Sequence, residues 1–64
     1  MKVVKKSPFS GKVHTREIPA KPEDYAKWQF DGVPIQNAMP YLSADDREFL
    51  MTGITPEEWE KSFG

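Results

Sequence analysis

The last third of the chain carries helix-start and helix-stop signals in close succession, and they constrain the local fold more tightly than any other segment. Ser43 precedes an alanine and two aspartates, so its hydroxyl can cap the free amides of a helix start. Gly53 can end that helix in the left-handed conformation. Thr55, with Glu58 three residues on, has the spacing of a capping box. The sequence therefore predicts a helix–turn–helix hairpin over residues 43–63.

The N-terminal segment, residues 2–18, is predicted to form a β-hairpin. Its first strand is rich in valine and lysine, and the turn region contains proline, serine and Gly11, which can take the positive φ that closes a loop of this length. An isolated hairpin is marginally stable in water, so one face must pack on helices or on another subunit. The second strand alternates between two faces, one with Val13, Thr15 and Glu17 and the other with His14, Arg16 and Ile18.

Prolines divide the middle of the chain. A Pro-Ala-Lys-Pro run at residues 19–22 ends the strand, and its second proline suits the first turn of a helix. Tyr25 and Trp28 share one face of that helix, and Gly32 follows its end. Residues 33–41 form either a single helical turn or irregular structure. The predicted fold class is α+β: an N-terminal β-hairpin, then two to three short helices ending in the helix–turn–helix hairpin.

The size of the chain predicts self-association. With 64 residues it is one domain, residues 1–64, and its stability margin is thin. Small domains usually compensate with disulfides, a metal or oligomerisation. The chain has no cysteine and only one histidine, so we expect no disulfide, metal site or cofactor. Oligomerisation remains, and the sequence favours a homo-oligomer.

Charge separates the domain into two parts. Residues 1–21 carry six basic residues and one acid, whereas residues 22–64 carry three basic residues and nine acids. The hairpin at 2–18 is therefore basic, and the helical part at 22–63 is acidic. No apolar run approaches the ~20 residues of a membrane span. The N-terminus is too short and too charged for a signal peptide, so we expect a cytoplasmic protein with no membrane partner.

The sequence predicts that the protein is not an enzyme. Nucleophilic catalysis needs a base, and the only histidine, His14, lies between Lys12 and Arg16, cations that lower its basicity. The carboxylate pairs at 45–46 and 57–58 stand at predicted helix starts, where capping and the helix dipole account for them. A two-carboxylate mechanism also needs a cleft that 64 residues can hardly build. No catalytic or metal-binding residue is therefore assigned.

Several binding surfaces remain open, each with a simpler interpretation beside it. The basic hairpin could hold an anion or enter a nucleic-acid groove, or its lysines could only block aggregation along an edge strand. The acidic helical part argues against a nucleic-acid module and could dock on a basic host protein, or it could be a solvated face. The amides of Gln36 and Asn37 could contact a base or a peptide, or satisfy local backbone groups.

Two passages carry a resemblance to known proteins. Residues 32–43 read Gly-Val-Pro-Ile-Gln-Asn-Ala-Met-Pro-Tyr-Leu-Ser, and residues 47–59 read Arg-Glu-Phe-Leu-Met-Thr-Gly-Ile-Thr-Pro-Glu-Glu-Trp. Together with Ser-Gly-Lys-Val at 10–13 and Ile-Pro at 18–19, this pattern resembles a group of small uncharacterised phage and prophage accessory proteins. The resemblance implies a phage origin. Because phage accessory proteins of this size often act by binding, it also implies inhibition of a host enzyme, block of a defence system, or sequestration of a signalling nucleotide.

These features together predict a small phage-type, non-catalytic binding protein of the anti-defence type, which inhibits or sequesters a host factor. The favoured ligand is an anionic small molecule such as a signalling nucleotide, held at a subunit interface, and a host protein is nearly as strongly favoured. The alternative is a nucleic-acid-binding accessory protein that uses the basic hairpin. Trp28 would supply a stacking face and Arg47 a bidentate phosphate clamp. The full set of predicted ligand-binding residues is Lys5, Lys6, Lys12, His14, Arg16, Trp28, Gln36, Asn37 and Arg47.

Overall fold

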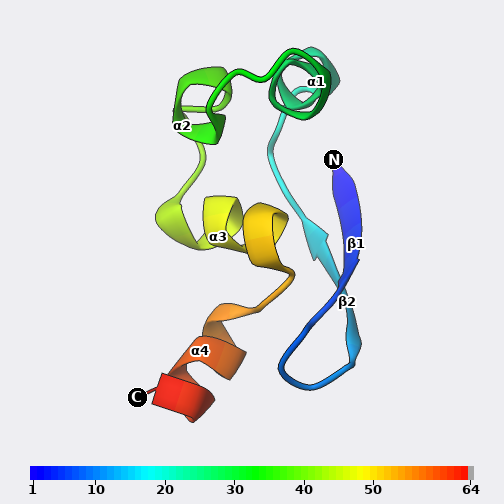
Figure 1. The fold of residues 1–64 in the computed structure, drawn as a ribbon, viewed down its shortest axis with the longest axis vertical. Coiled ribbons are helices and arrows are strands. Elements are labelled where there is room, and N and C mark those ends of the chain that lie inside the picture. The colour runs from blue at the N-terminus through cyan, green and yellow to red at the C-terminus, as the bar shows by residue number, and fades with distance from the viewer. Residues whose placement is uncertain (64) are drawn as a thin grey trace.

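A two-stranded antiparallel sheet and four helices make up the computed structural model, which describes residues 1–63 (Figure 1). The predicted α+β class, with an N-terminal hairpin before the helices, is confirmed. The residues at 33–41 do form a helical turn, which adds a fourth helix to the two or three expected. The elements are β1 (Lys2–Lys6), β2 (Val13–Glu17), α1 (Pro22–Phe30), α2 (Ile35–Ala38), α3 (Ala44–Thr52) and α4 (Pro56–Phe63).

The register of the hairpin gives it an inner and an outer face. Val3 pairs with Arg16, and Lys5 pairs with His14, so these side chains share the inner face against the helices. The outer face carries the remaining pairs and is exposed, with Val4 58% and Val13 64% accessible. The predicted alternation along β2 is confirmed. The face that turns inward is the one with the histidine and the arginine.

The hydrophobic core lies between the inner face of the hairpin and α3. Phe49 and Leu50 of α3 are fully buried, as are Ile18 after β2 and Met39 after α2. Val3, Ala20, Ala38 and Leu42 complete the buried cluster. Neither α1 nor α4 contributes a fully buried residue. The core is therefore concentrated in the middle of the molecule; α1 packs at its margin through Tyr25 and Trp28, and no residue of α4 belongs to the cluster.

The predicted caps of α3 and α4 are confirmed atom by atom. The Ser43 hydroxyl accepts the amide of Asp46 at 3.1 Å. Gly53 ends α3 with φ 79°, and its amide donates to the Phe49 carbonyl at 2.8 Å. Thr55 and Glu58 form the capping box: the Glu58 amide donates to the Thr55 hydroxyl at 3.2 Å, and the Thr55 amide donates to the Glu58 carboxylate at 3.1 Å.

The molecule is elongated, with principal extents of 32 × 20 × 19 Å. Helices α1 and α2 lie at one end, and α4 lies at the opposite end, on the side of the loop between β1 and β2 (Figure 1). In the stretch 1–63, no helix is long and apolar enough to cross a membrane. The end that carries α4 and the hairpin loop contains the candidate site.

Candidate functional site

Two adjoining cavities lie where the hairpin meets α4. The first has a volume of about 300 Å³ and is lined by Lys12, His14, Thr55, Glu57, Glu58 and Lys61. The second has a volume of about 210 Å³ and is lined by Phe9, Ser10, Lys12, Glu58, Lys61 and Ser62. Lys12, Glu58 and Lys61 line both, so the two cavities adjoin at these three residues. We call the two together the hairpin–α4 pocket.

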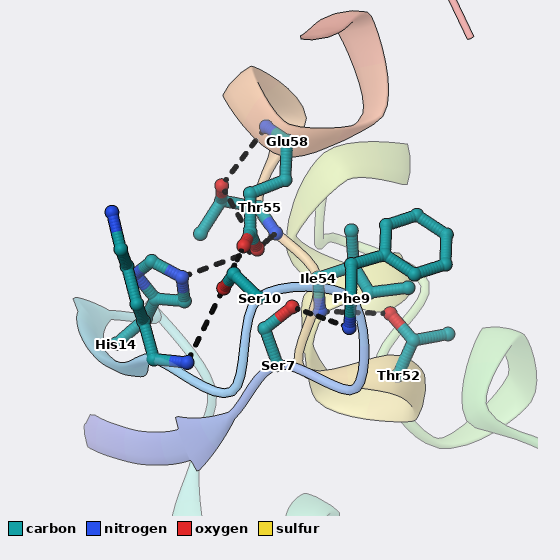
Figure 2. Close-up of polar contacts among 9 residues, drawn as sticks. Ser7, Phe9, Ser10, His14, Thr52, Ile54, Thr55 and Glu58 are labelled. Atoms are coloured by element: carbon teal, nitrogen blue, oxygen red, sulfur yellow. Dashed lines mark hydrogen bonds and ion pairs between the residues drawn. The ribbon is translucent and has the colours of Figure 1, made fainter. Parts of the chain in front are cut away.

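Glu58 fastens α4 to the hairpin from the middle of this pocket (Figure 2). The Ser10 hydroxyl donates to its Oε2 at 2.5 Å, and the Thr55 amide donates to its Oε1 at 3.1 Å. His14 Nε2 lies 3.1 Å from the same Oε1. The Ser10 hydrogen bond, with help from Thr55 and His14 and against partial desolvation, lowers the pKa of Glu58 to about 2. The carboxylate is therefore ionised and its oxygens are already occupied by donors.

The order of these groups differs from that of a hydrolytic triad. In a triad the histidine stands between the serine and the acid, so that it can take the serine proton. Here the carboxylate stands in the middle: Ser10 donates to Glu58, and His14 faces the other oxygen of the same carboxylate. The His14 Nε2 is buried and is not aligned for a hydrogen bond, even though it lies at ion-pair distance. This arrangement suits a fixed pocket wall and gives Ser10 no imidazole base.

The two lysines of the pocket come from distant segments. Lys12 follows Gly11, whose φ of 72° turns the loop, and the Lys12 amide donates to the Ser10 hydroxyl at 3.2 Å. Lys61 lies one turn after Glu58 on α4. Both side chains are exposed, and neither takes part in an ion pair with another residue of the described chain. Two ammonium groups are therefore available to a ligand at one place.

An aromatic side chain borders the second cavity. Phe9 is 46% exposed and packs edge-on against Trp59, at a centroid distance of 5.6 Å, and against Phe63, at 5.5 Å. The Phe9 amide also donates to the Ser7 hydroxyl, which is fully buried. The ring is thus fixed in place while part of it stays accessible. Fixed, half-exposed aromatic rings are surfaces on which flat ligands stack.

The structure brings together two of the predicted ligand-binding residues, Lys12 and His14, in this pocket. Lys5 pairs with His14 on the inner face and is half-buried, whereas Lys6 is exposed on the outer face. Arg16 is used within the fold: its guanidinium lies 3.3 Å from the Asp46 carboxylate and 5.6 Å from the centre of the Phe49 ring.

The other four predicted residues lie on the helical part of the molecule. The Trp28 ring packs edge-on against Tyr25 at 5.6 Å, at the margin of the core. Gln36 and Asn37 are exposed on α2, and Arg47 is half-buried on α3. None of the four lines the hairpin–α4 pocket. Their role in ligand binding stays a prediction, and they would act outside the hairpin–α4 pocket.

Sequence reasoning missed Ser10, Glu58 and Lys61 as site residues. The capping box located the Glu58 side chain at a helix start, which was a correct local signal. Its position in the pocket wall depends on a hydrogen bond from Ser10, 48 residues away in the chain, and no local sequence pattern predicts that contact. Searches for related proteins find no matching family model, no matching curated protein and no matching solved structure. The resemblance to phage and prophage proteins stays a prediction.

Proposed function

We propose that this protein is a non-catalytic binding protein that captures a small anionic ligand in the hairpin–α4 pocket. In this proposal it acts as a phage-type accessory protein of the anti-defence type, by sequestering the ligand of a host factor. One observation carries the proposal: Lys12 of the hairpin loop and Lys61 of α4 line the same two cavities. Hydrogen bonds between ammonium groups and a phosphate or carboxylate are among the stronger polar contacts in proteins.

The carboxylates in the pocket do not oppose this use. Both oxygens of Glu58 already accept hydrogen bonds, from the Ser10 hydroxyl and from the Thr55 amide. Glu57 is exposed at the rim of the first cavity. Lys12 and Lys61 therefore have no fixed partner among the described residues and can pair with a ligand. The first cavity, at about 300 Å³, is at the lower end of the ~300–1,000 Å³ of small-molecule sites.

The proposal includes a homo-oligomer. The outer face of the hairpin is not covered by any other segment of residues 1–63, and its Val4 and Val13 side chains are mostly exposed. A two-stranded sheet of this kind gains stability when its open face or edge is covered. A second copy of the chain is the partner that the small size of the domain favours.

A host protein is the second candidate target. Phe63 at the end of α4 is 68% exposed and lies beside Phe9, itself 46% exposed. Clustered exposed aromatic side chains are typical anchors of protein interfaces. This surface borders the pocket, so a bound protein and a bound anion would compete for the same end of the molecule.

The nucleic-acid alternative has less support. A basic ribbon that enters a groove needs its cations on one exposed face. In this hairpin only Lys2 and Lys6 extend from the strands on the outer face, whereas His14 and Arg16 face inward toward Glu58 and Asp46.

Calorimetric titration with a panel of nucleotides and inorganic pyrophosphate tests the proposal. Lys12→Ala and Lys61→Ala should each weaken the binding of an anion by about tenfold to a hundredfold, since a hydrogen bond to a charged group contributes ~1.5–3 kcal/mol. Lys2→Ala is the matched control, because it removes the same charge from the opposite end of the hairpin. Absence of heat with every anion at low salt, or an equal loss in the control, would refute anion capture in this pocket.

A further inference from the structure

We infer that the hairpin–α4 pocket takes a dinucleotide, with its phosphodiester between Lys12 and Lys61 and one nucleoside in each cavity. The inference rests on the proposed function and deepens it by naming the ligand class. Its starting point is the lining of the two cavities, which share Lys12, Glu58 and Lys61 and differ in their other residues: His14, Thr55 and Glu57 in the first, Phe9, Ser10 and Ser62 in the second. A ligand that fills both must carry its anionic group in the middle and two uncharged groups at its ends.

The charge of the lining favours a phosphodiester over a polyphosphate. Two lysines face two glutamates, and His14 adds at most one further positive charge. The net charge of the lining is therefore between zero and +1. A phosphodiester carries a single negative charge and matches this balance. A triphosphate carries several more and would have to approach the carboxylates of Glu57 and Glu58 without enough cations to compensate.

The two cavities also offer different contacts to their occupants. The second contains the accessible part of the Phe9 ring, fixed by Trp59 and Phe63, which suits a base that stacks. The first contains the Glu57 carboxylate, which can accept from an exocyclic amino group of a base, as carboxylates do from the amino group of cytosine. One cavity of about 210 Å³ is small for a ligand site, but the two together fall within the usual ~300–1,000 Å³.

The same chemistry occurs in two sources: a free dinucleotide, linear or cyclic, and one step of a single-stranded nucleic acid. Calorimetric titration of the full chain with a mononucleotide, a linear dinucleotide, a cyclic dinucleotide and a single-stranded hexanucleotide separates them. We expect a dinucleotide to bind at least about tenfold more tightly than a mononucleotide, because a second base adds stacking or hydrogen bonds. A hexanucleotide that binds as tightly as the dinucleotide identifies a strand as the source, and a weaker one identifies the free dinucleotide.

Two variants test the cavities separately. Phe9→Leu keeps an apolar contact with α4 but removes the stacking ring, and Glu57→Gln changes an exposed acceptor without touching the core. Phe9→Leu should weaken dinucleotide binding several-fold more than it weakens the binding of inorganic pyrophosphate, since stacking on an aromatic contributes ~1–3 kcal/mol per base. Glu57→Gln should also lower the affinity for the dinucleotide relative to that for pyrophosphate, because the loss of a negative charge favours the polyanion. Equal affinities for mononucleotide and dinucleotide would overturn this inference and leave the proposed function standing. Loss of binding for every anion, pyrophosphate included, would overturn both.

Discussion

Replacing Gly53 with alanine tests how α3 is joined to the hairpin. Gly53 has φ 79°, a region that costs an alanine about 1–2 kcal/mol. A Cβ at this position would also lie 2.8 Å from the carbonyl oxygen of Lys6 and 3.3 Å from Cβ of Lys5. Because the close atom is backbone, β1 and α3 must move apart, at a typical overpacking cost of about 1–3 kcal/mol. The expected loss is thus about 2–5 kcal/mol, a large part of the roughly 3–10 kcal/mol that a chain of this length has.

Gly32→Ala is the matched control for this substitution. Gly32 has nearly the same conformation, φ 73°, but a Cβ there meets no atom within 4 Å. It should therefore lose only the conformational part, about 1–2 kcal/mol. Urea unfolding followed by tryptophan fluorescence and far-UV circular dichroism measures both free energies of unfolding. If the two variants lose the same free energy to within about 0.5 kcal/mol, the contact between Gly53 and the end of β1 contributes nothing and the reasoning fails.

Three further predictions concern single side chains. The pKa of Glu58 is lowered from 4.5 to about 2, so its ionised form stabilises the fold fully above pH 4.5, and this stabilisation is lost as the pH falls toward 2. In thermal melts between pH 2 and 6, Glu58→Gln should therefore make the melting temperature depend less on pH. Ser43→Ala removes the cap of α3 and should lower the free energy of unfolding by about 1 kcal/mol in urea titrations. Arg16→Met removes the contacts with Asp46 and Phe49 and should cost about 1 kcal/mol, while calorimetry should find the affinity for anions unchanged, because Arg16 acts within the fold.

The sequence predicted the ends of the helices well because their signals are local. The caps at Ser43 and Thr55 and the stop at Gly53 involve groups at most four residues apart. The start of α1 at Pro22 was also predicted correctly, although Lys21 provides no side-chain cap there. The sequence of residues 33–41 does not decide between a helical turn and an irregular segment, because its two prolines permit both. Contacts with the core decide it: Ala38 and Met39 are buried.

The orientation of the hairpin could not be predicted from its alternation. One face carries Val13 and the other carries His14, Arg16 and Ile18, so each face has one aliphatic residue and hydrophobicity alone does not decide which turns inward. The structure buries Ile18 and exposes Val13. On this inner face Ile18 packs in the core, and α3 and α4 supply acidic partners, Asp46 and Glu58, to Arg16 and His14. Alternation along a strand predicts which residues share a face of the sheet. It does not predict which face is covered, because the covering residues come from elsewhere in the chain.

The same long-range contacts explain why the structure brings only two of the predicted ligand-binding residues together in the pocket. The basic residues of the hairpin were grouped because they are close in sequence, yet the structure divides them among the outer face, the inner face and the loop. Arg16 pairs with an acid 30 positions away, and Ser10 with one 48 positions away. Lys61, which completes the pocket, lies in the acidic half of the chain. The negative net charge of that segment gives no indication that one of its basic residues belongs to an anion site.

The pocket exists only while α4 is docked on the hairpin, so ligand binding and the docking of α4 depend on each other. α4 has no fully buried residue, and its contacts with the hairpin run through Phe9, Ser10 and His14, which also line the cavities. Undocking of α4 therefore separates Lys61 from Lys12 and abolishes the pocket. A ligand that bridges the two lysines binds only the docked state, so its apparent affinity is reduced by the docked fraction, and bound ligand in turn stabilises the docking. Phe63 lines neither cavity but packs against Phe9, so its contribution to affinity is indirect, through the position of α4.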